Sequence, residues 1–65
     1  MLNVNALKAE MVKNNYTQAS LAEALGMSPR TFYNRLQTGD FGAIEIKKMI
    51  DLMNIKEPVP IFFAE

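Results

Sequence analysis

Residues 17–39 read TQASLAEALGMSPRTFYNRLQTG, and this stretch decides the fold. Thr17 is a favourable N-cap for a short helix over Gln18 to Leu25, because its hydroxyl can accept a free backbone N–H of the first turn. Gly26 follows at the place where a left-handed residue ends a helix at low conformational cost. The small Ala22 inside this helix allows a neighbouring helix to approach closely.

A second helix follows at once and is signalled even more clearly. Ser28 is a strong N-cap, and Pro29 falls at the first helical position, where its missing N–H costs nothing. Phe32 and Leu36 lie one turn apart and form the buried face, and Gly39 ends the helix. Two short helices therefore meet across three residues, which predicts a helix-turn-helix over about residues 17–38. The outer face of the second helix is then exposed, and a helix presented in this way fits the major groove of B-DNA.

Further helices are expected on both sides of this stretch. The N-terminal one begins after Asn3 or Asn5 and ends near Asn14, and the other covers about Ala43 to Met53. Both have apolar residues at three- and four-residue spacing: Val4, Leu7 and Met11 in the first, and Ala43, Ile46, Ile50 and Met53 in the second. No stretch of strict alternation reaches strand length. The sequence therefore predicts one compact all-α domain over residues 1–65, with four to five helices.

The last residues, 58–65, are conspicuously apolar. Pro58 opens a short turn, and Pro60 is tolerated in its first turn. Two interpretations stay open: the segment folds back over the first and fourth helices as a cap on the core, or it contacts a second copy of the chain. Aromatic side chains dominate interface energetics, which favours a contact of this kind. The candidate dimer residues are Val59, Ile61, Phe62 and Phe63.

Composition argues against an enzyme. The chain has 65 residues, enough for one domain, with no cysteine and no histidine. It therefore lacks a thiol nucleophile, the commonest general base and the commonest transition-metal ligand, and we expect no metal and no cofactor. Four carboxylates are interpreted as solvated charges without acid–base partners: Asp40, Glu45, Asp51 and Glu57. The methionines at helical core spacing are interpreted as flexible core filler.

The formal net charge is zero, whereas nucleic-acid-binding domains usually carry excess basic residues. The distribution is uneven, with four basic and two acidic residues in 1–39 against three basic and five acidic residues in 40–65. One end of the molecule is thus expected to be modestly positive. No apolar run approaches the length of a membrane span, and the first residues do not resemble a signal peptide, so a cytoplasmic location is expected.

Residues 18–28, QASLAEALGMS, resemble the helix-turn-helix of the Cro/repressor superfamily, also called the XRE family. The continuation TFYNRL and the final apolar residues are similar to small phage and prophage Cro-like proteins. The resemblance extends over essentially the whole chain and implies a lambda-repressor-like fold. One position departs from the family pattern: an apolar residue often stands where this chain has Arg35, and here Leu36 takes that place. We therefore expect the exposed face of the helix to be rotated slightly.

The resemblance implies which residues face DNA. Base contacts are expected from the helix that begins at Pro29, at Pro29, Arg30, Tyr33 and Asn34. Arginine can donate two hydrogen bonds to guanine, asparagine can pair with adenine in the same manner, and proline offers only apolar contact. Phosphate contacts are expected from Thr17, Gln18, Ser28, Gln37, Thr38 and Lys47. A plain surface role remains as good an interpretation of Lys47 and its neighbour Lys48.

The expected function is that of a sequence-specific DNA-binding transcriptional regulator acting on an operator in double-stranded DNA. A homodimer is expected on DNA, because two half-sites about 34 Å apart would supply the affinity that one small domain lacks. An alternative from another class is a protein-interaction module that modulates another phage regulator without reading DNA. The neutral charge and the apolar tail favour that alternative.

Overall fold

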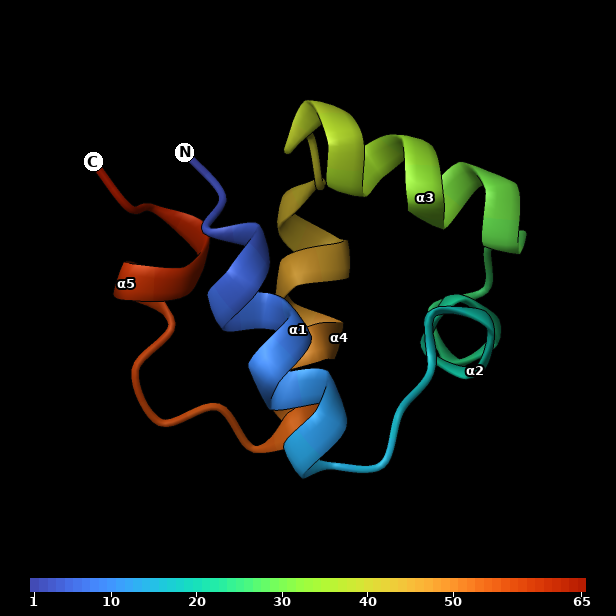
Figure 1. Cartoon of the computed structure of the whole chain (residues 1–65), viewed down its shortest axis with the longest axis horizontal. Helices are drawn as coiled ribbons and strands as arrows, with labels where there is room; N and C mark the ends of the chain where they lie inside the picture. Colours follow the sequence, from blue (N-terminus) through green and yellow to red (C-terminus); the bar gives the residue numbers. More distant parts are fainter.

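Five helices and no strand make up the protein in a computed structural model that describes all residues from 1 to 65 (Figure 1). They are α1 (Val4–Lys13), α2 (Gln18–Ala24), α3 (Pro29–Thr38), α4 (Ala43–Met53) and α5 (Val59–Phe62). The molecule measures 27 × 23 × 20 Å along its principal axes. The predicted compact all-α fold is thus confirmed. None of the helices has the length and apolar character that crossing a membrane requires.

The helix boundaries follow local chemistry. Thr17 Oγ1 accepts the N–H of Ser20 at 3.0 Å, and Ser20 Oγ accepts the N–H of Thr17 at 2.9 Å, which satisfies two otherwise unpaired donors at the start of α2. Ser28 caps α3 in the same way, and Gly26 and Gly39 adopt positive φ of 77° and 72° behind α2 and α3. The predicted caps and stops are therefore confirmed, with α2 one residue shorter than expected.

The first helix begins after Asn3, the earlier of the two predicted positions. The side chain of Asn3 accepts the N–H of Ala6 at 3.0 Å, as an N-cap does. The same residue donates its backbone N–H to the carbonyl of Ile61 at 2.7 Å. This hydrogen bond joins the beginning of the chain to α5, and both termini lie beside α5 in Figure 1.

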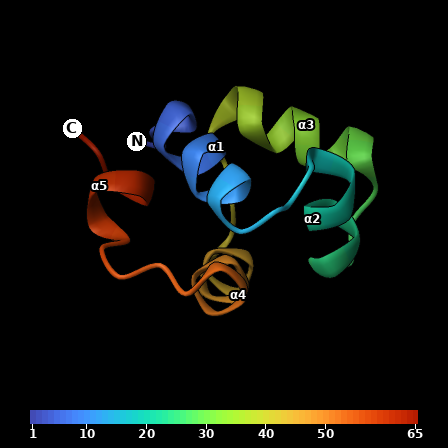
Figure 2. The same cartoon turned by 60° about the horizontal axis from the view of Figure 1, so that its bottom comes forward.

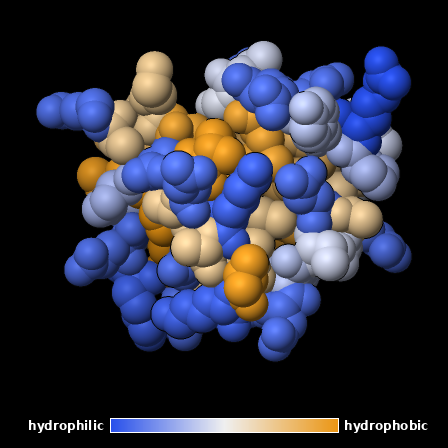
Figure 3. Space-filling view, viewed as in Figure 1, coloured by the Kyte–Doolittle hydropathy of each residue, from blue (hydrophilic) through white to orange (hydrophobic).

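Thirteen residues are buried, and all of them are apolar. All five helices and the connections next to them supply the core: Leu7, Met11, Leu21, Ala22, Leu25, Phe32, Leu36, Phe41, Met49, Met53, Ile55, Ile61 and Phe62. The rings of Phe32 and Phe41 lie 5.6 Å apart and are tilted, a favourable arrangement for aromatic pairs. Hydrophobic residues remain visible near the middle of one face, among hydrophilic ones (Figure 3).

One predicted apolar stripe is partly wrong. On α4 the fully buried side chains are Met49 and Met53, one turn apart, whereas Ile46 and Ile50 are only half-buried and Ala43 is exposed. The inward face of α4 is therefore centred on the two methionines, and Ala43 lies outside the core at the first position of the helix. Unbranched methionine side chains adapt to irregular space between packed helices, which suits them to this central position.

The tail folds back onto the core. Ile61 and Phe62 are buried and α5 lies beside α1, so of the two interpretations of residues 58–65 the core cap is confirmed for these two side chains. Their burial corrects the prediction that they contact a second copy, because a side chain inside the core has no surface to offer. Val59 and Phe63 are 62% and 58% exposed and remain available on the outside.

Candidate nucleic-acid interface

The helix α3 has one apolar face and one polar face. Phe32 and Leu36 are buried, which holds the first face against the rest of the molecule. Arg30, Asn34 and Gln37 follow at four- and three-residue spacing on the opposite side, and all three are exposed. Figure 1 shows α3 along one edge of the molecule, and Figure 2 shows it lying next to α2. The predicted exposure of these polar residues is confirmed.

Backbone hydrogen bonds hold the short connection between α2 and α3. The N–H of Met27 donates to the carbonyl of Ala22 at 3.0 Å, and the N–H of Gly26 donates to the carbonyl of Glu23 at 3.0 Å. The Ala22 carbonyl also accepts the N–H of Leu25 at 3.1 Å, so the turn is bonded to the last residues of α2 by several backbone groups. Ala22 is completely buried, as expected of a small residue between two closely packed helices. The two helices of the α2–turn–α3 unit are therefore closely packed and joined by a hydrogen-bonded turn.

The beginning of α3 places two further predicted residues at the surface. Pro29 occupies the first helical position and is exposed, and Tyr33 is about half exposed on the flank between the apolar and polar faces. Ser28 Oγ accepts the N–H of Thr31 at 3.2 Å and donates to the Thr31 hydroxyl at 3.0 Å. The exposed Ser28 hydroxyl thus already serves as a cap and retains only limited capacity for a phosphate.

Three of the other predicted phosphate contacts are also engaged within the protein. Thr17 is exposed but bonded to Ser20, and the Thr38 hydroxyl donates to the Asn34 carbonyl at 3.2 Å. Lys47 lies on α4, where its ammonium is 3.4 Å from the Asp51 carboxylate in an exposed pair. Gln37 is exposed and Gln18 is half-buried.

The two arginines of α3 differ in their ion pairing. Arg30 is exposed and takes part in no ion pair. Arg35, in contrast, is paired: its Nη1 lies 2.6 Å from Glu45 Oε1. The interpretation of Glu45 as a freely solvated charge is therefore wrong. Its side chain is only 23% exposed, because the connection between α3 and α4 brings it against Arg35.

Sequence reasoning missed this pair, although part of the signal was present. Glu45 is the third residue after Gly42, the spacing at which a glutamate accepts the N–H of an N-cap residue. Its Oε1 accepts the N–H of Gly42 at 2.9 Å. The spacing therefore indicates the cap, whereas the partner arginine ten residues earlier is brought close only by the path of the chain.

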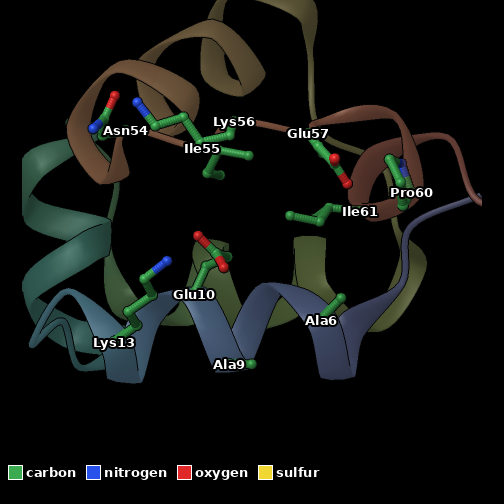
Figure 4. A pocket seen from close by; sticks show the side chains of 10 residues that line it. All are labelled: Ala6, Ala9, Glu10, Lys13, Asn54, Ile55, Lys56, Glu57, Pro60 and Ile61. Carbon is green, nitrogen blue, oxygen red and sulfur yellow. The ribbon is translucent and has the colours of Figure 1, made fainter.

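A hollow in the surface lies elsewhere, between α1 and residues 54–61, and has a volume of about 370 Å³. Figure 4 shows Glu10 and Lys13 rising from α1 on one side of it, with Ile55 and Ile61 on the other. Its lining mixes apolar side chains with two acidic and two basic ones. No group of three or more His, Cys, Asp or Glu side chains converges there or elsewhere in the molecule. The polar face of α3 therefore remains the candidate site with the clearest organisation.

The chain was also compared with protein-family models, with curated proteins and with solved structures, and none of them matches it.

Proposed function

We propose that this protein is a sequence-specific DNA-binding transcriptional regulator of Cro/repressor type that inserts α3 into the major groove of an operator. The observation that carries the proposal is the division of α3 into a face held in the core and a polar face directed outward. In this reading α2 and α3 form the helix-turn-helix of a lambda-repressor-like fold. The hydrogen-bonded turn between the two helices supports this proposal, because a recognition helix must be held in place to read bases.

The dimensions of α3 suit a groove. An α-helix with its side chains is about 10–12 Å across, and the major groove of B-DNA is about 12 Å wide. Arg30 and Asn34 are four residues apart, so their attachment points are separated by about 6 Å along the helix. Successive base pairs are about 3.4 Å apart, so the two side chains would reach bases about two steps from each other. The proposed partners are guanine for Arg30 and adenine for Asn34.

The charge of the molecule shapes the expected binding mode. The net charge is zero, and of the seven basic residues Arg35 and Lys47 are paired with carboxylates. Two or three basic residues of each domain would contact phosphates, and neutral groups such as Gln37 and Gln18 would add further contacts. We therefore propose a dimer on a palindromic operator, since two half-sites would compensate for weak binding by each domain. The exposed Val59 and Phe63 are the candidate contacts between the two copies.

Selection of bound fragments from a pool of random duplexes tests this proposal. Enrichment of a palindrome is expected, and Arg30→Ala should lower the affinity for the selected duplex by about 5- to 150-fold, the equivalent of 1–3 kcal/mol. Lys56→Ala is the matched control, because it removes one positive charge from the connection between α4 and α5, away from α3. If no sequence is enriched, or if both variants lose affinity equally, the proposal fails.

A second candidate function is a protein-interaction module that modulates another regulator. The exposed apolar side chains of Val59 and Phe63 favour it, since such a surface can bind a partner. The two candidates separate in one comparison. If Arg30→Ala lowers the affinity for DNA by about 5- to 150-fold and leaves a partner complex intact, the protein binds DNA independently of any partner. If the wild type selects no DNA and Phe63→Ala disrupts a partner complex, the interaction module is the function.

A further inference from the structure

The connection between α3 and α4 is held together by one arginine. Arg35 Nη1 donates to Glu45 Oε1 at 2.6 Å and to the carbonyl of Asp40 at 3.3 Å. The same Glu45 oxygen accepts the N–H of Gly42 at 2.9 Å. One carboxylate oxygen thus joins a side chain of α3 to the backbone that begins α4. Four polar groups meet at this point, and the residues between the helices are tied to both.

The pair lies where it can control the orientation of α3. Arg35 follows Asn34 directly in the sequence, and it is attached to the flank of α3 between the buried Leu36 and the outward face. The other contacts that seat α3 against the core are apolar, and apolar contacts have little directional preference. A hydrogen bond between charged groups is short, strong and directional, and the planar guanidinium loses little freedom in forming it. The pair is therefore the directional contact between α3 and the start of α4.

The same contact pairs a positive charge on the surface with a negative one. The side chain of Arg35 is 37% exposed, but its guanidinium is occupied by Glu45 and by the Asp40 carbonyl. An arginine freed on the flank of a DNA-reading helix would bind phosphate irrespective of sequence. Glu45 therefore acts against binding that is independent of sequence.

We propose that Arg35 and Glu45 are positioning residues that give α3 its sequence discrimination: they fix its orientation and keep the charge of Arg35 away from the phosphates. This inference rests on the proposed DNA-binding function. It predicts that the pair contributes to the ratio between the affinities for the selected duplex and for a scrambled one, because reading bases requires side chains held within about 0.5 Å.

Two variants separate the two parts of this role. Glu45→Gln retains an oxygen for the Gly42 N–H but removes the negative charge that holds the Arg35 guanidinium. The discrimination ratio should fall about tenfold, and binding to the scrambled duplex should become more salt-dependent by about 0.9 in log–log slope for each domain bound. Arg35→Met removes the charge together with the pair, so the ratio should fall without any increase in salt dependence. Glu57→Gln is the matched control, because it raises the net charge by one as Glu45→Gln does, but at an exposed carboxylate between α4 and α5 that takes part in no ion pair.

The measurements are made by fluorescence anisotropy at a temperature where circular dichroism shows each variant to be folded. In parallel, residual dipolar couplings of the free proteins report the orientation of α3 relative to α4. A change of that orientation in Arg35→Met, absent in Glu57→Gln, is expected. An unchanged orientation, or a ratio within twofold of the wild type in both variants of the pair, overturns the inference. If the wild type selects no duplex, the proposed function fails and discrimination with it, whereas the dipolar couplings still decide whether the pair orients α3.

Discussion

Replacing Gly26 by alanine isolates the backbone strain of the turn between α2 and α3. Gly26 has a φ of 77°, and a Cβ built on it would meet no atom within 4 Å. The added methyl group therefore clashes with no neighbouring residue, and only the strain of the backbone conformation remains. Placing an L-residue in the left-handed region costs about 1–2 kcal/mol, and the loss of glycine freedom in the unfolded chain returns about 0.4–1 kcal/mol. The net expectation is a decrease of about 1 kcal/mol in the free energy of unfolding.

Urea unfolding followed by circular dichroism measures this change, and thermal unfolding should show a decrease of about 4–8 °C in Tm. Gly26→Asn is the matched variant, because asparagine tolerates positive φ, as Asn15 and Asn54 already do in this chain. It should cost less than Gly26→Ala. A neutral or stabilising Gly26→Ala, or an asparagine variant that is less stable than the alanine variant, would refute the reasoning.

Three further predictions concern the core, a cap and the electrostatics. Met49→Ala should lower the free energy of unfolding by about 2–5 kcal/mol in urea titrations, and Leu52→Ala on the same helix should cost clearly less, because Leu52 is 41% exposed. Ser28→Ala should cost about 1 kcal/mol by the same assay, since it leaves the N–H of Thr31 without its cap. The affinity of a dimer for the selected duplex should fall with salt at a log–log slope of about −4 to −5, corresponding to four to six phosphate contacts. A flat salt response in anisotropy titrations would argue against DNA binding.

The helix boundaries could be predicted because they depend on neighbouring residues alone. The hydroxyls of Thr17 and Ser28 reach backbone N–H groups three residues ahead, and Gly26 and Gly39 relieve strain in the residue where each helix stops. The exposure of Arg30 follows from helical periodicity once Phe32 and Leu36 are assigned to the core, and this too depends only on neighbouring residues. Sequence reasoning therefore reached both the elements and the polar face of α3.

The features that the sequence did not predict depend on how elements that are far apart in the chain pack together. The sequence predicts a solvated Glu45 side chain, because nothing near this residue in the sequence identifies Arg35 as its partner. The tail left two interpretations open, because apolar side chains such as Phe62 and Phe63 look alike in sequence and only packing against α1 separates the buried one from the exposed one. Likewise, Ile46 and Ile50 are only half-buried because of the space that the neighbours of α4 leave, whereas the helical spacing of Met49 already indicates its burial.

The most direct test of the central claim is a map of backbone amide chemical shifts during titration with the selected duplex. If α3 reads DNA, the largest shift changes should fall on residues 29–38 and near Thr17. Arg30→Ala should need a duplex concentration about 5- to 150-fold higher to reach the same changes, while the spectrum of the free variant remains that of a folded protein. Shift changes confined to the surface around Val59 and Phe63, or none at a saturating concentration of duplex, would contradict the account.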